Sequence, residues 1–185
     1  MTGLIVIGII LAMIVFVVAG TYNSLVTARN HCDEAWADVD TELKRRYDLI
    51  PNLVNTVKGY AQHERGLLEE VTRLREVCVK NVGTPNEQAQ TENELIRLLN
   101  ALMVRVESYP QLKASTNFLE LQHELVNTED RIQAARRFYN GNVRENNNLV
   151  QSFPMNLVAR MFGFRDREFF EIQDVAVRAA PKVEM

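Results

Sequence analysis

LIVIGIILAMIVFVVA, residues 4–19, decides the architecture, because this stretch carries no charged or strongly polar side chain. With Gly3 and Gly20 it reaches the short end of the ~17–25 residues that a helix needs to cross a bilayer. Tyr22 follows at a position suited to an interfacial aromatic residue. The sequence therefore predicts a transmembrane anchor over residues 1–21 that is kept in the mature protein.

A cleaved signal peptide and a buried core helix are the alternatives to an anchor. A signal peptide needs a basic segment before the apolar run, but Thr2 and Gly3 occupy that place, and residues 19–21 form a poor cleavage site. The unbroken apolar run is too long for a core helix. Arg29 is the one basic residue within ~15–20 residues after the run, which favours a cytoplasmic soluble part over a periplasmic or extracytoplasmic one.

Beyond the anchor, apolar residues recur at spacings of three and four along residues 22–80, the pattern of an amphipathic helix close to a coiled-coil seam. No Gly/Pro/Ser-rich linker separates this pattern from the anchor, so we expect one helix to run through both. Acid-to-base pairs four residues apart, such as Glu76 and Lys80, support that helix. Pro51 interrupts it and predicts a kink or a restart near Asp48.

Basic residues 44–46 interrupt the apolar seam. In a straight helix Arg46 would lie ~39 Å from the membrane, well beyond the ~10 Å range of headgroup charge in 0.1 M salt. We therefore interpret this triplet as a solvated helix face or a contact to another chain. Trp36 falls on the seam with Val39 and Leu43, and it should be largely buried.

Residues 81–86, NVGTPN, form the clearest turn in the chain. A second helix begins near Glu87, and Pro110 kinks or ends it. A boundary is predicted at residues 127–128, before a further helix that Gly141 weakens. The fold class is therefore all-α: one transmembrane helix continuing into an antiparallel bundle of three to four long helices.

The bundle is assigned to residues 22–150, and a Phe-rich segment with a tail to residues 151–185. Pro154 suits the first turn of a short helix in that segment. The segment is either a lid packed on the end of the helices or an exposed apolar patch for a partner. Residues 174–185 show no reliable amphipathic pattern.

Composition and motifs give no sign of an active site. The chain of 185 residues has 21 basic and 24 acidic side chains and a net charge of −3, which does not suggest a nucleic-acid binder. His31, His63 and His123 are too scattered for a metal motif, and no nucleophile elbow, phosphate loop or Cys-x-x-Cys occurs. No catalytic, cofactor-binding or metal-binding residue is predicted. Cys32 and Cys78 are expected to be free, packed thiols.

Five blocks of sequence resemble the LemA family. They are YNSLVTARN, EAWADVDTELKRRYDLIPNLVNTVKGYAQHE, NFLELQHEL, RIQAARRFYN and FPMNLVARMFGF, at residues 22–30, 34–64, 117–125, 131–140 and 153–164. The chain departs from the family pattern at NGNVRENNNLV, where a glycine and asparagines replace better helix formers. The resemblance implies an α-helical, membrane-anchored bacterial protein without assigned catalytic activity. It also implies association with a membrane metalloprotease of the HtpX-like type, and hence membrane protein quality control.

Three hypotheses of function follow. The favoured one is a non-catalytic, membrane-anchored scaffold or adaptor in the bacterial inner membrane that self-associates and binds a membrane partner. A membrane sensor would need a ligand cavity in the helical domain. An enzyme would need a site formed only in the fold, with convergent polar groups in a deep pocket.

Self-association is predicted from the apolar surface of the long first helix, which shorter partner helices would leave partly uncovered near the membrane. Tethered copies also meet at raised effective concentration. The residues assigned to contacts with another copy or a partner are Leu25, Cys32, Trp36, Val39, Phe153, Leu157, Met161, Phe162 and Phe164.

Overall fold

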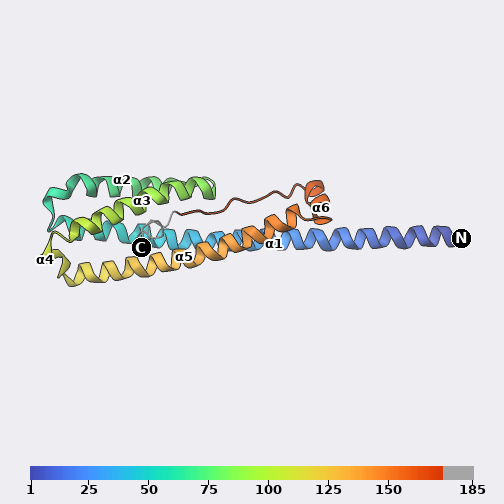
Figure 1. Cartoon of the computed structure of the whole chain (residues 1–185), viewed down its shortest axis with the longest axis horizontal. Helices are drawn as coiled ribbons and strands as arrows, with labels where there is room; N and C mark the ends of the chain where they lie inside the picture. The colour runs from blue at the N-terminus through green and yellow to red at the C-terminus, as the bar shows by residue number, and fades with distance from the viewer. Residues whose placement is uncertain (173–185) are drawn as a thin grey trace, which may run out of the picture. The chain divides into compact units, whose positions relative to one another are not determined.

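The computed structural model describes residues 1–172 as helices joined by short connections (Figure 1). No strand occurs in this part of the chain, which confirms the all-α class. The predicted tail over residues 174–185 lies outside the described residues. The elements are α1 Thr2–Lys58, the 3-10 helix η1 Gln62–Glu64, α2 Arg65–Lys80, α3 Pro85–Val106, α4 Pro110–Lys113, α5 Thr116–Gln151 and α6 Met155–Phe162.

α1 joins the predicted anchor to the bundle without a break. It contains 57 residues, which corresponds to about 86 Å of helix. An 18-residue window near its N-terminus has a mean hydropathy of 3.0 and is 0% buried within the chain. α1 therefore has the length and composition of a transmembrane helix, and it continues as the first helix of the bundle as predicted.

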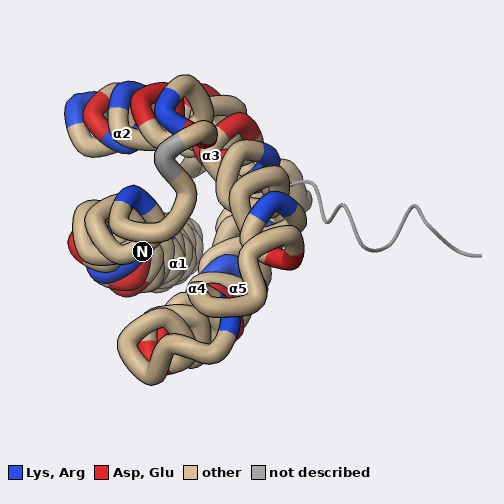
Figure 2. The backbone as a smooth tube through the Cα atoms, turned by 90° about the vertical axis from the view of Figure 1, so that its left-hand side faces the viewer, with Lys and Arg blue, Asp and Glu red and all other residues tan. Residues whose placement is uncertain are grey.

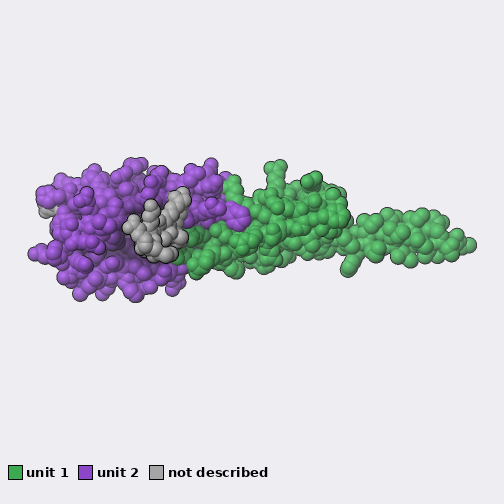
Figure 3. Space-filling model, in the orientation of Figure 1, with its two compact units in different colours: residues 1–40, 133–168 green, residues 41–132, 169–185 purple. Residues whose placement is uncertain are grey.

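The chain forms two compact units, each built from segments distant in sequence (Figure 3). The first unit contains residues 1–40 and 133–168. The second contains residues 41–132 and the described residues 169–172. α1 and α5 each contribute to both units. The predicted division at residues 21 and 150 follows the sequence order instead, and it stays a prediction.

Pro51 lies inside α1, so the helix does not restart near Asp48. A proline cannot donate the hydrogen bond that the carbonyl four residues earlier would accept. That carbonyl belongs to Tyr47, and Arg75 Nε of α2 donates to it over 2.7 Å. The substituted donor explains how the helix continues through the proline.

The predicted helix over residues 22–80 is wrong in its length, because α1 ends at Lys58. The amides of Tyr60 and Ala61 both donate to the carbonyl of Val57, at 3.0 and 2.9 Å, and the chain then turns through η1 into α2. Ala61 is fully buried in the turn. Tertiary packing forms a buried turn of this kind, and the heptad-like spacing of apolar residues does not predict it.

The turn between α2 and α3 is where the sequence predicts it. Thr84 is the N-cap of α3, and its side chain accepts a hydrogen bond from the Glu87 amide while the Glu87 carboxylate accepts from the Thr84 amide. Pro85 follows at the first helical position. This capping box with a proline gives α3 a defined start.

The apolar core of the second unit lies where α1, α2, α3, α4 and α5 approach one another. Pro110 opens α4 after α3 has ended at Val106, so this proline marks a helix boundary. The connection places Leu112 and Phe118 in the core beside the residues of the earlier helices. The buried members are Leu53, Val57, Ala61, Leu68, Leu102, Val106, Leu112 and Phe118.

α5 is a single helix of 36 residues, so the boundary predicted at residues 127–128 is wrong. Thr128 is fully buried, and its hydroxyl donates to the Glu124 carbonyl over 2.7 Å inside the helix. Gly141 lies within α5 and does not end it. In the second unit α5 runs antiparallel to α1, with Arg131 paired to Glu42 at 3.8 Å.

Charged side chains occupy the outer faces of the helices. Figure 2 shows basic and acidic residues interspersed along α2. The predicted pair of Glu76 with Lys80 forms at 3.8 Å. Exposed pairs of this type contribute roughly 0.3–0.5 kcal/mol each, so the buried contacts described above decide the stability of the bundle.

In the first unit, the asparagine-rich part of α5 holds the chain that follows α6. The side chain of Asn147 donates to the Arg167 carbonyl over 2.9 Å and accepts from the Arg167 amide over 2.8 Å. Tyr139 donates to the Glu168 carbonyl over 2.9 Å, and Arg167 pairs with Asp33 of α1 at 2.7 Å. One of the asparagines that depart from the family pattern, Asn147, thus binds the segment 163–168 to α5, while the Arg167 side chain binds it to α1.

α6 closes the first unit against the membrane-proximal part of α1. Pro154 precedes the helix as its N-cap, and Gly163 ends it with a φ of 76°. That left-handed conformation suits glycine at a helix end. Val158 and Ala159 of α6 pack on Leu25 of α1. The Phe-rich segment therefore does pack on the helices, as the lid interpretation expects, although only one of its faces is buried.

Candidate functional site

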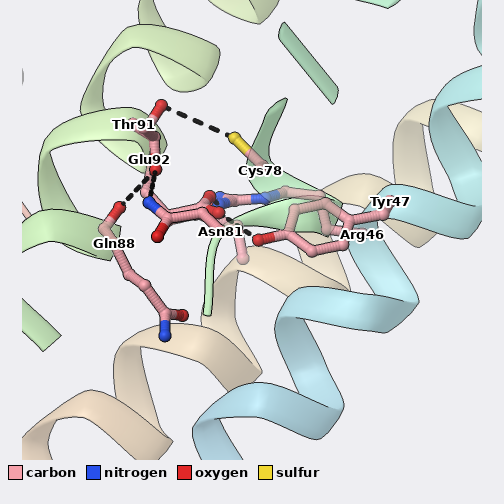
Figure 4. Close-up of polar contacts among 8 residues, drawn as sticks. Arg46, Tyr47, Cys78, Asn81, Gln88, Thr91 and Glu92 are labelled. Carbon is pink, nitrogen blue, oxygen red and sulfur yellow. Dashed lines mark hydrogen bonds and ion pairs between the residues drawn. The ribbon is translucent and has the colours of Figure 1, made fainter. Parts of the chain in front are cut away.

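The most unusual polar feature of the described chain is an ion cluster inside the second unit (Figure 4). Arg46 of α1 and Glu92 of α3 are 2% and 1% exposed, and their side chains form an ion pair. Arg46 Nη1 also donates to Glu129 Oε2 of α5 over 2.9 Å. One guanidinium thus joins three helices through two carboxylates.

Tyr47 also contacts Glu92, because its hydroxyl donates a hydrogen bond to the Glu92 carboxylate. Burial and the Glu92 carboxylate raise the pKa of Tyr47 well above its usual range. Burial alone would lower the pKa of Arg46, but Glu92 and Glu129 outweigh it and the pKa is raised. Tyr47 therefore stays protonated and Arg46 stays charged, so neither group is suited to proton transfer near neutral pH.

Cys78 of α2 borders the same cluster. Its thiol donates to the Thr91 carbonyl over 3.7 Å, and Asn81 Nδ2 donates to the Thr91 hydroxyl over 3.1 Å. Burial, with the Glu92 charge, raises the pKa of Cys78 to about 12. Cys32, in the first unit, also has a pKa raised by burial. Both cysteines are free and buried, as predicted, and neither resembles an activated nucleophile.

The two native thiols are expected to resist alkylation in the folded chain. A rise of the Cys78 pKa from 9.0 to about 12 lowers the thiolate population about 10³-fold at pH 8. We expect the native protein in detergent to react with a maleimide far more slowly than the unfolded protein. The variant Val79→Cys, at a neighbouring position that is 49% exposed, is the control and should gain one rapidly labelled thiol. Equal rates before and after unfolding would contradict the buried environment.

Neither Arg46 nor Glu92 lines the groove that the structure describes in the second unit. The groove of the second unit lies elsewhere, between α1 and α2, with a volume of about 550 Å³. Its lining carries charges of both signs and no histidine, cysteine or serine. The lining residues are Val54, Lys58, Arg65, Leu68, Glu69, Thr72, Arg73 and Glu76.

The histidines do not converge on a site. His31 lies on the surface of α1, 3.6 Å from Glu34, and His63 is exposed in η1. His123 is exposed on α5, with its Nδ1 3.1 Å from the amide of Asn127. Across residues 1–172, no group of three His, Cys, Asp or Glu side chains is placed to hold a metal ion.

Four of the predicted contact residues lie on the seam of α1, and that seam is covered within the chain. Leu25, Cys32 and Val39 are 0% exposed. Trp36 is partly buried, with its ring 5.1 Å from that of Tyr139 on α5. The expectation that this part of α1 is left uncovered is therefore wrong, because α5 is longer than predicted. These residues stabilise the fold in a single copy.

The other predicted contact residues belong to the segment around α6, and most of them reach the surface. Phe153, Leu157, Met161 and Phe162 are 80%, 59%, 65% and 49% exposed. Phe164 is partly buried. The structure thus separates the predicted set into a buried group on α1 and an exposed apolar group on and beside α6.

Arg46 and Glu92 were not predicted as a site, although a signal for each exists. Arg46 lies three residues after Leu43 and four before Ile50, so it occupies a seam position. Its interpretation as a solvated residue or a contact to another chain is wrong, because an acidic partner inside the same chain neutralises it. A charge at an apolar seam position is the signal that could have indicated a buried pair.

Comparison with known proteins agrees with this architecture. The model of the LemA family matches residues 35–185. Protein LemA of Metamycoplasma hominis is 25% identical over 160 residues, 86% of this chain and 73% of that protein. Magnetosome protein MamQ of Magnetospirillum gryphiswaldense is 24% identical over 174 residues, and magnetosome protein MamQ 2 of Paramagnetospirillum magneticum is 25% identical over 175 residues.

These alignments cover 80% and 81% of this chain but only 64% of each MamQ protein, so the chain spans less than two thirds of their length. The LemA protein is matched over a larger share, and the family model covers most of the present sequence. On that coverage, the chain belongs to the LemA family.

Proposed function

We propose that this protein is a membrane-anchored, non-catalytic helical scaffold or adaptor of the bacterial inner membrane. The observation that carries the proposal is α1, a single helix that runs from the apolar span into the bundle. A continuous helix holds the bundle in a defined orientation to the bilayer, where a flexible linker would not. The buried Arg46 cluster supports a structural role, since it joins α1, α3 and α5 and its Arg46 and Glu92 side chains are almost fully buried.

The scaffold would act by self-association and by binding a membrane partner. Tethered copies share one plane, which raises their effective concentration. Val104 on α3 and Val126 on α5 are 66% and 55% exposed and offer apolar surface for contacts. Resemblance to other LemA proteins suggests an HtpX-like metalloprotease as the partner, with membrane protein quality control as the process.

Self-association is tested on the full chain in mild detergents by light scattering. After subtraction of the detergent, the protein mass should be at least about twice the chain mass of 21.2 kDa. A dilution series is the control, because a true assembly dissociates reversibly on dilution. A mass of one chain at every concentration and in several detergents would remove the scaffold proposal.

Partner binding is tested by a photo-cross-linking residue placed at Val104 or Val126 of the full chain in intact membranes. The expected products are a dimer of the chain and an adduct with the membrane metalloprotease. Cells without the protease should lose only the second product. Absence of that adduct from both positions would argue against the protease as partner.

We place the bundle on the cytoplasmic side of the membrane. Arg29 follows the span, and the free thiols of Cys32 and Cys78 suit a reducing compartment. The Val79→Cys variant described above reports the side directly. A membrane-impermeant maleimide should label it only after the cells are opened, and labelling of intact cells would reverse the orientation.

A further inference from the structure

We propose that α6 is an interfacial helix whose exposed apolar stripe lies in the boundary between lipid headgroups and acyl chains, beside the anchor. The stripe consists of Leu157 and Met161, which lie four residues apart on α6 and are 59% and 65% exposed; Phe153, in the turn before α6, adds an apolar side chain that is 80% exposed. Side chains four residues apart share one face of a helix. An apolar stripe of this kind, on a helix otherwise fixed to the protein, needs a partner of its own.

The opposite face of α6 fixes its depth relative to the span. Val158 and Ala159 pack on Leu25, and Val18 packs against the same cluster. Val18 belongs to the apolar run of α1, and Tyr22 makes an edge-on ring contact with Phe162 at 4.9 Å. α6 is therefore attached to α1 at the end of the span, and Figure 1 shows α1 continuing beyond it towards the N-terminus.

The length of the span brings α6 to the level of the lipid. Residues 4–19 cover about 24 Å at 1.5 Å per residue, whereas the hydrocarbon layer is about 30 Å thick. The residues that flank the run are therefore drawn to the hydrocarbon edge, and on this side they include Tyr22 and the turns of α1 that carry α6. At that depth the stripe contacts lipid in a single copy of the chain, without self-association.

Three arginines lie on α6 or close to it, as expected at a headgroup layer. Arg160 and Arg165 are exposed, the first of them on α6 itself. Arg29 lies over the ring of Phe164, 5.5 Å from its centroid. Arginines beside an apolar face can place their guanidinium groups among lipid phosphates while their stems cover apolar surface. This pairing of charges with the stripe favours a lipid surface over a second copy of the chain.

The test uses the full chain in lipid bilayers, with Cys32 and Cys78 replaced by alanine and an environment-sensitive fluorophore on one introduced cysteine. Leu157→Cys and Met161→Cys report on the stripe. Phe138→Cys is the matched control, because Phe138 is also an exposed apolar residue of the first unit, 61% exposed. It neighbours Tyr139, which contacts Trp36, a residue about 26 Å along α1 from the end of the apolar run.

In bilayers containing lipids brominated near the headgroup, both stripe positions should shift to shorter emission wavelength. They should also be quenched about twofold or more relative to the Phe138→Cys control. A shift without quenching would mean that protein covers the stripe, such as a second copy, and would overturn the proposal. Emission typical of water at both positions would overturn it as well. Unchanged helicity by circular dichroism confirms that each labelled variant is folded.

Discussion

Replacing Arg46 by methionine is expected to lower the free energy of unfolding by about 3–5 kcal/mol, because the change leaves the Glu92 carboxylate buried without its counter-charge. Glu92 is 1% exposed, so water cannot take over the lost contacts. The Glu129 carboxylate, on the other side of the guanidinium, loses a hydrogen bond of 2.9 Å. The measurement is chemical unfolding of the full chain in micelles, followed by circular dichroism.

Arg45 provides the matched control for this experiment. It precedes Arg46 in α1 and pairs with Glu124 at 3.4 Å, but both side chains are nearly half exposed. Arg45→Met should therefore cost less than about 1 kcal/mol. The double variant Arg46→Met with Glu92→Met should be more stable than Arg46→Met alone, since it removes the stranded charge. Equal effects of Arg45→Met and Arg46→Met would show that solvent reaches the cluster.

Replacing Phe118 by alanine is expected to cost about 3–5 kcal/mol, the usual range for a large aromatic side chain in a core. Phe118 is 2% exposed and packs in the core of the second unit at the start of α5. Leu119→Ala is the control, because Leu119 is 48% exposed at the next position of the same helix. Unfolding of both variants under the same conditions gives the difference directly. A Phe118→Ala cost as small as that of Leu119→Ala would place this end of α5 outside the core.

Local signals in the sequence were sufficient for much of the fold. The apolar run predicts the span, and the residues around Thr84 predict the turn and the start of α3, because capping depends on neighbouring residues only. Pro51 left a kink and a helix restart open for the opposite reason. Its effect on α1 depends on Arg75, a residue of another helix that supplies the missing donor. Only tertiary structure brings those two positions together.

The candidate site was harder to predict than the helices. Whether a charged residue on an apolar seam is solvated or buried depends on a counter-charge 46 positions away, as in Arg46 with Glu92. The predicted contact residues of α1 are covered within the chain for a related reason, because α5 continues past residues 127–128 as one helix. The five phenylalanines within residues 153–170 drew attention to the segment around α6, but composition left open whether it packs as a lid or forms an exposed patch.

Asn147 recognises position 167 through its main chain, by donating to the carbonyl and accepting from the amide. Every amino acid except proline presents the same two groups, so a substitution at position 167 keeps the contact with Asn147 and loses only the ion pair with Asp33. The constraint falls instead on position 147, where aspartate would keep the acceptor but lose the donor. In evolutionary terms, selection for this contact acts on the side chain at position 147 and not on the side chain at position 167.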